Sequence, residues 1–239
     1  MRIAGVDGCR GGWVAVCAGE DFLNPRVEVI PVFEQLPDAM GGWPDIVAVD
    51  MPVGLVNDWG RTPEPEARRL LGRPRSSSVF PSPPRRLVEM YVSSRATGPE
   101  TFDALNEWSK QVTGQGLQLQ TFHLLKKIGE IDAVLQRDEA PPGIFEVHPE
   151  LAFWAMNGES ATRLNKRSAA GREERRVILS RSLPPVLLEL PTPRGCAEDD
   201  LLDALAAIWS AARLATGNAD RVGACEQDPV LRRTIAIWY

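Results

Sequence analysis

The sequence lacks long apolar segments, histidine-rich stretches and paired cysteines. No stretch is long and apolar enough to span a membrane, and the chain starts directly with a strand-like segment rather than a signal peptide. We therefore expect a cytoplasmic protein without a membrane partner. Its 2 histidines and 4 scattered cysteines do not form the spacings typical of zinc sites or disulfide frameworks. The cysteines are predicted to be reduced thiols that pack as small apolar side chains.

The overall charge is slightly negative, and positive charge is concentrated in two segments. A formal net charge of −5 argues against nonspecific coating of nucleic acid, but it does not exclude a nuclease. Residues 61–100 contain arginines and no lysine, and residues 161–182 are also basic. Each segment is predicted to be a solvated surface or a phosphate-binding flank, since guanidinium groups match phosphate oxygens. On the second interpretation the candidate substrate-binding residues are Arg10, Arg75, Arg85, Lys166 and Arg175.

The length fits one large domain with an insertion. A chain of 239 residues can bury a substantial core. We predict a single domain over residues 1–239, with a helical, arginine-rich insertion over about 57–140. Within it, helices are expected at about 64–72 and 84–95, followed by two helical patterns over 101–138.

The first strand-like segment ends on a carboxylate. Apolar runs over about 2–8 and 12–19 predict a β-hairpin whose first strand is buried on both faces, with Asp7 at its C-terminal end. Glycines at 8, 11 and 12 are predicted to supply positive φ angles or close backbone approach. A carboxylate in such a place needs a partner, a set of hydrogen bonds or a metal ion.

A second apolar run also ends on an aspartate. After an antiparallel strand over 26–32 and a short helix near 33–40, residues 44–52 predict a central strand parallel to the first, ending near Asp50. Ligands bind at the carboxyl ends of strands in open α/β sheets. Asp7 and Asp50 are therefore predicted to occupy equivalent places at that edge.

The segment 143–150 adds further candidates. It is predicted to be a short strand that runs into a helix, with Glu146 and His148 on one face. Glu150 is explained as a first-turn acid that complements the helix dipole. His123, in contrast, is predicted to be a core or boundary residue of a long helix rather than a ligand.

The last major helix is predicted to open with Asp200 and Asp203. The two aspartates are three residues apart and share a helix face that continues with alanines. Such a small-residue face allows close approach to a sheet, and its carboxylates would point toward the strand ends. A terminal strand is expected over 234–238.

Converging carboxylates repel one another and are stabilised by a shared divalent cation. Oxygen ligands without cysteine or histidine clusters favour Mg²⁺ or Mn²⁺ over zinc. The candidate metal ligands are Asp7, Asp50, Asp200 and Asp203. Two such ions would activate water and stabilise the leaving oxygen of a phosphodiester.

The order of these motifs resembles known proteins. Asp at the end of strand 1, Asp after a later parallel strand and an acidic C-terminal helix are similar to the ribonuclease H-like superfamily, and residues 200–206 resemble the helix opening of RuvC-type Holliday junction resolvases. The whole set looks like domain-of-unknown-function family 429, described as predicted nucleases. The matching motifs cover residues 7–13, 49–55, 145–150 and 199–204.

The resemblance implies a mixed α/β fold, three antiparallel strands followed by two parallel ones, with a helical insertion between strands 4 and 5. It also implies a metal-dependent phosphodiester hydrolase acting on nucleic acid or a nucleotide. In that family pattern Asp7 bridges two ions, Asp50 binds one, and Asp200 or Asp203 binds the other or orients water. Glu146 would be a further ligand or a general base, and His148 would assist the leaving group or contact phosphate.

Two alternatives stay open at this stage. A phosphotransferase of the actin-like superfamily shares the strand-1 aspartate and glycine turn, but its second phosphate loop has no counterpart after residue 150. A non-catalytic binding protein would keep the fold and pair its carboxylates with arginines, and Arg10 is the obvious partner for Asp7. The oligomeric state is open, with a homodimer among the alternatives.

Overall fold

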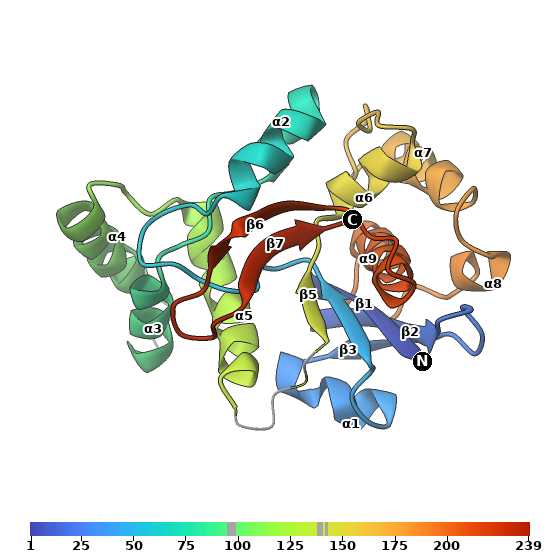
Figure 1. Ribbon diagram of the computed structural model, residues 1–239, viewed down its shortest axis with the longest axis horizontal. Helices are drawn as coiled ribbons and strands as arrows, with labels where there is room; N and C mark the ends of the chain where they lie inside the picture. The colour runs from blue at the N-terminus through green and yellow to red at the C-terminus, as the bar shows by residue number, and fades with distance from the viewer. Residues whose placement is uncertain (95–98, 138–140, 142) are drawn as a thin grey trace.

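The computed structural model describes residues 1–94, 99–137, 141 and 143–239. A mixed five-stranded sheet lies at its centre in the order β3-β2-β1-β4-β5 (Figure 1). Strands β1 to β3 are antiparallel neighbours, and β4 and β5 run parallel to β1, which confirms the predicted fold class. The strands are β1 Arg2–Cys9, β2 Gly12–Gly19, β3 Arg26–Ile30, β4 Ile46–Val49 and β5 Ile144–Glu146.

Glycine shapes the hairpin between β1 and β2. Cys9 pairs with Gly12 across a two-residue turn. Of the three glycines expected to adopt positive φ, Gly12 alone does so, with φ 124°. Gly11 instead allows close approach, because a Cβ there would lie 2.7 Å from a methyl carbon of Val29. The turn is thereby held against β3.

Alternation along β1 assigns its side chains to two helical layers. Ile3 belongs to the core shared with α9 Glu198–Ala215, and Ala4 and Val6 belong to the core on the opposite face. At Gly5 a Cβ would lie 2.2 Å from the carbonyl oxygen of Ala204, so only glycine lets α9 pack this closely on the sheet. Helices α6 Pro149–Met156, α7 Ala169–Leu179 and α8 Pro185–Leu188 complete the α9 side.

The opposite face is covered by helices between β4 and β5 and by the short helices after β3. These are η1 Phe33–Gln35, α1 Leu36–Met40, α3 Arg85–Ser94, α4 Pro99–Thr113 and α5 Leu119–Leu135. The helix α2 Pro63–Arg75, followed by η2 Ser76–Ser78, packs in a separate core with α6. The helical character expected for this stretch is confirmed. None of the helices in the described ranges combines the length and apolar character needed to cross a membrane.

One detail of these helices agrees with expectation and one differs. The helix expected over about 64–72 is interrupted at Gly72 (φ 56°, ψ −167°), and Arg73 is extended. His123 was predicted at the core or its boundary, but it is exposed on α5. Its ring meets the edge of Phe122 at a centroid distance of 5.7 Å, so one turn of α5 buries the phenylalanine and leaves the histidine in solvent.

A C-terminal hairpin joins the two halves of the molecule. Strands β6 Arg221–Gln227 and β7 Thr234–Trp238 form a separate two-stranded sheet (Figure 1). The strand over 234–238 was expected, whereas β6 falls in a segment expected to be a loop. Trp238 forms a parallel bridge with Val147, directly after β5. The hairpin therefore lies against the end of the central sheet.

Candidate functional site

Three aspartates, one of them partly exposed, converge where β1 and β4 end beside α9. Asp7 is 6% exposed and Asp203 is 2% exposed. Because side chains two residues apart lie on the same face of a strand, Asp7 faces the same side as Gly5, which touches α9. Asp50 likewise faces the same side as Ala48, which packs in the core beside α9. Each strand therefore directs its terminal carboxyl group toward the helix that carries Asp203. The structure brings these three predicted ligands together.

The three carboxyl groups repel one another. Burial raises the pKa of Asp7 well above its ordinary value, and repulsion from Asp50 and Asp203 adds to this. Burial likewise raises the pKa of Asp50, although a hydrogen bond with the Asp7 carboxyl group lowers it in part. For Asp203, burial outweighs an attractive lysine and raises the pKa to about 6. The cluster thus binds protons more tightly than exposed carboxyl groups do.

The ammonium group of Lys166 neutralises part of this charge. Its Nζ lies 2.6 Å from Oδ2 of Asp203. Burial alone would lower the pKa of Lys166, but attraction to Asp203, Asp7 and Asp50 outweighs burial and raises it. The lysine side chain keeps 37% of its surface exposed, so the ammonium group reaches the buried carboxylates from the rim of the site.

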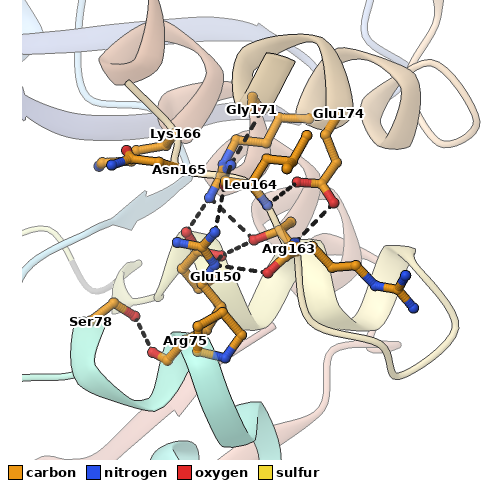
Figure 2. A network of polar contacts seen from close by, with 12 residues as sticks. Arg75, Ser78, Glu150, Arg163, Leu164, Asn165, Lys166, Gly171 and Glu174 are labelled. Carbon is orange, nitrogen blue, oxygen red and sulfur yellow. Dashed lines mark hydrogen bonds and ion pairs between the residues drawn. The ribbon is translucent and has the colours of Figure 1, made fainter. Parts of the chain in front are cut away.

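The loop between α6 and α7 places Lys166 (Figure 2). The carboxylate of Glu174 accepts hydrogen bonds from the backbone N–H groups of Arg163 and Leu164, each 2.9 Å long. From the other side Arg75 donates to the carbonyl oxygen of Leu164 at 2.5 Å. Side chains from α7 and from the end of α2 thereby fix the backbone two residues before the lysine.

A buried ion pair supports the same loop. Arg175, 0% exposed, pairs with the carboxylate of Glu150 and lies over the ring of Phe153, 5.2 Å from its centroid. The second oxygen of Glu150 accepts a 2.7 Å hydrogen bond from the hydroxyl of Thr162 in the loop (Figure 2). Arg75 and Arg175, predicted to bind substrate, are thus committed to contacts within the protein.

Asp200 lies at the edge of the cluster rather than in it. Its carboxylate accepts a 3.1 Å hydrogen bond from the backbone N–H of Ala197 at the start of α9. Burial raises its pKa, and the group adds to the repulsion felt by Asp7. The two members of the predicted Asp-x-x-Asp pair therefore differ. Asp203 is buried in the cluster, and Asp200 also caps the N-terminus of α9.

Glu146 does not join the cluster. It forms a two-pronged ion pair with Arg61, with distances of 2.7 and 2.6 Å, and accepts a 2.8 Å hydrogen bond from the backbone of Val53. The register explains this: Glu146 pairs with Val49, so it shares the face opposite to Asp50. Glu146, expected to be a further ligand or a general base, is therefore held by Arg61 on the other face of the sheet.

His148 is held beside Asp50 by the start of α6. Its Nδ1 accepts a hydrogen bond from the backbone N–H of Glu150 at 3.2 Å, which assigns the proton to Nε2, 3.4 Å from the carbonyl oxygen of Ser78. Burial raises the pKa of Asp50, and the interaction with His148 offsets part of that rise. Glu146 and His148 are therefore not on one face, because the chain leaves β5 between them.

The remaining predicted cations differ in their surroundings. Arg85 is buried and donates to both oxygens of Asp132 at 2.8 Å and to Asp228. Arg10 is exposed in the turn between β1 and β2 and forms no ion pair with Asp7 in the described part of the chain. Arg85 is therefore committed to contacts within the protein.

Two features near Asp7 were not anticipated. Lys127 of α5 donates to the carbonyl oxygen of Gly12, lies 4.5 Å from the ring centroid of Trp13 and is attracted by Asp7. A lysine within the apolar pattern of α5 is a sequence signal that points to it. A hydrogen bond between Cys9 and Cys196 lowers the pKa of Cys9 to about 7, and no sequence signal pairs cysteines so far apart.

The donor set suits a hard divalent cation by its chemistry. The cluster offers carboxylate oxygens and surplus negative charge, which are what Mg²⁺ or Mn²⁺ requires. Among the described residues, however, no three His, Cys, Asp or Glu side chains are grouped as an ion requires. The ammonium group of Lys166 instead occupies one oxygen of Asp203. Asp203 would have to release Lys166 to become a ligand.

Comparison with known proteins yields one match. The model of a family described as protein of unknown function (DUF429) matches residues 5–228. The matched range includes Asp7, Asp50, Lys166 and Asp203. Neither curated proteins nor solved structures provide a match. The likeness expected from the four sequence motifs is confirmed.

The ion pair of Glu146 predicts a structural role. Glu146→Gln should lower the free energy of unfolding by about 3 kcal/mol, because it leaves the buried guanidinium of Arg61 without its full counter-charge. Glu34→Gln is the control, since the pair of Glu34 with Arg137 is 54% and 52% exposed, and it should cost less than about 1 kcal/mol. Urea unfolding measures both. Equal losses would contradict the structural assignment.

The pKa of Asp203 predicts a pH dependence of stability. Because it is raised from 3.8 to about 6, the folded chain binds this proton more tightly than the unfolded chain. The resulting stabilisation is complete below pH 3.8 and is lost as the pH rises through about 6. Acidification from neutral pH to pH ~5 should therefore raise the free energy of unfolding by about 1 kcal/mol more in the wild type than in Asp203→Asn.

The control for this pH series is Asp38→Asn, which replaces an exposed carboxylate. It should follow the wild-type pH profile. Chemical unfolding at a series of pH values gives the pH dependence of the free energy of unfolding for the wild type and both variants. A profile of Asp203→Asn that matches the wild type would contradict the raised pKa.

Proposed function

The chain belongs to this family of proteins of unknown function, and we propose that it is a divalent-metal-dependent phosphodiester hydrolase acting on a nucleic acid or nucleotide. The observation that carries the proposal is the convergence of Asp7, Asp50 and Asp203 from β1, β4 and α9. Buried like charges at a strand edge are costly, and they are typical of sites whose occupant is a cation.

The ligands we propose are Asp7, Asp50 and Asp203, with Asp200 at the rim. Asp7, between the other two in its electrostatic interactions, is the bridging candidate. Bound Mg²⁺ or Mn²⁺ would supply Lewis-acid activation of water and stabilisation of the leaving oxygen. The resemblance of the motifs to ribonuclease H-like nucleases supports the same reaction class.

Lys166 and His148 would support the carboxylates and the substrate. In the absence of an ion, Lys166 keeps the carboxylates together by attraction. When Asp203 turns to a cation, the freed ammonium group of Lys166 is placed to bind a phosphate oxygen at the rim. His148 offsets part of the rise in the pKa of Asp50 that burial causes, and its two ring nitrogens are oriented by backbone groups of Glu150 and Ser78.

Asp7→Asn tests the mechanism directly. Binding of Mn²⁺, measured by calorimetry, and Mn²⁺-dependent cleavage of an oligonucleotide should both fall by at least about a hundredfold. The fold should persist with an equal or higher melting temperature, because the change removes a repelled buried charge and the asparagine oxygen can keep the 2.7 Å bond from the Gly8 N–H. Asp38→Asn is the exposed control and should keep both properties. Full activity of Asp7→Asn would contradict the proposal.

Lys166→Gln tests whether the lysine competes with the cation. Removal of the ammonium group should increase Mn²⁺ affinity about tenfold, since the ion no longer displaces a like charge from Asp203. Lys126→Gln is the control, because the side chain of Lys126 is 65% exposed on α5. The Mn²⁺ affinity of this variant should be unchanged. An unchanged or weaker affinity of Lys166→Gln would show that the lysine does not occupy the ion's place.

A non-catalytic binding protein is the second candidate. It is favoured by the pairing of Asp203 with Lys166, which neutralises part of the cluster without an ion. The same calorimetric titration separates the two functions: absence of Mn²⁺ binding in both the wild type and Lys166→Gln would favour this second candidate.

A further inference from the structure

A groove of about 690 Å³ lies where α2, η2 and the start of α5 meet. This volume is within the range of 300–1,000 Å³ typical of ligand-binding clefts. The groove is separate from the carboxylate cluster in composition, because none of its lining residues is acidic. The lining residues are Arg68, Arg73, Pro74, Ser76, Ser77, Val79, Phe80, Pro81, Gln118 and Gln120.

The cations of the groove are placed for phosphate. Arg68 donates from Nε to the carbonyl oxygen of Val79 at 2.9 Å, which orients its guanidinium group at the wall. Arg73 is exposed beyond the interruption of α2. Ser77, also exposed, adds a hydroxyl. Guanidinium and hydroxyl groups without a neighbouring carboxylate form a surface that favours phosphate oxygens.

Other lining residues are suited to bases. Gln118 and Gln120 are exposed, and each amide offers both a hydrogen-bond donor and an acceptor. Phe80, which is half-buried, supplies the aromatic side chain of the lining. Aromatic rings in positively charged grooves stack on unpaired bases. A base in a duplex is not accessible to such a ring, which favours a single strand.

The groove is connected to the carboxylate cluster by η2. Ser76 and Ser77 line the groove, and the next residue, Ser78, faces Nε2 of His148 through its carbonyl oxygen at 3.4 Å. His148 in turn interacts with Asp50. Arg75, beside the groove residue Pro74, holds the loop that carries Lys166 (Figure 2). One short segment therefore borders both places.

We infer that this groove binds single-stranded nucleic acid, with Arg68 and Arg73 on the phosphates and Phe80 against a base. Binding in the groove does not depend on the proposed function. Only the cleavage of the bound strand at the carboxylate cluster rests on it. The groove assigns the substrate class of that site as a single strand, and not a duplex or a free mononucleotide.

The test measures binding of a fluorescein-labelled oligothymidine of about twelve nucleotides. Fluorescence anisotropy, recorded without divalent cations, gives the affinity. Arg73→Ala should weaken binding about tenfold and reduce the salt dependence by about one phosphate contact. Phe80→Leu should also weaken binding about tenfold, through lost stacking. Arg69→Ala is the matched control: Arg69 is an exposed arginine of the same helix outside the groove, and its affinity should change less than about twofold.

Three results would overturn the inference: no binding by the wild type, equal losses for Arg69→Ala and Arg73→Ala, or equal affinity for a duplex of the same length. A cleavage assay on the wild type separates this inference from the proposed function. Binding that depends on Arg73, in a wild type that does not cleave the oligonucleotide with Mn²⁺, would overturn the hydrolase and support the groove. Cleavage by the wild type with binding unaffected by Arg73→Ala would do the reverse.

Discussion

Buried charge needs a counter-charge, and this constraint accounts for most of the polar architecture. Arg61, Arg85 and Arg175 are all within the protein, and each is paired with one or more carboxylates. These pairs link elements that are distant in sequence: α2 with β5, α3 with α5, and α6 with α7. Removal of either partner would leave an uncompensated charge away from water, so the pairs fix where the elements sit.

The carboxylate cluster departs from this pattern. Asp7, Asp50 and Asp203 share one hydrogen-bonded lysine, whereas Glu146 alone is held by both prongs of a guanidinium group. Elsewhere each buried carboxylate in the described part of the chain contacts a guanidinium group directly, whereas at this edge of the sheet one ammonium group is shared. The contrast within one molecule identifies the edge as the place where a cation or a cationic ligand group would be retained, rather than as one more structural pair.

Periodicity predicted the fold and the central part of the site. Apolar runs that end in Asp7 and Asp50 predict strands whose ends meet, and the Asp-x-x-Asp opening predicts a helix carrying Asp203. Glu146 could not be placed, because strand alternation alone does not give the register between β4 and β5, and a shift of one residue reverses the face.

The arginines were harder to predict for a different reason. Composition does not distinguish a guanidinium group in solvent from one paired inside the protein, so Arg85 and Arg175 were predicted at a substrate surface although both are buried. Their acidic partners lie far along the chain or on another helix. Only the tertiary structure shows that the two basic segments contain internal pairs as well as the exposed groove residue Arg73.

The placement of Asp228 has a consequence for the order of folding. From the turn between β6 and β7 it accepts a hydrogen bond from the backbone of Leu55, 173 residues earlier, and pairs with Arg85, 143 residues earlier. Closure of such long loops costs chain entropy before the contacts are gained. The helices between β4 and β5 can form locally, but the guanidinium of Arg85 obtains its second carboxylate only after nearly the whole chain has been made, so the interior of the insertion is completed last.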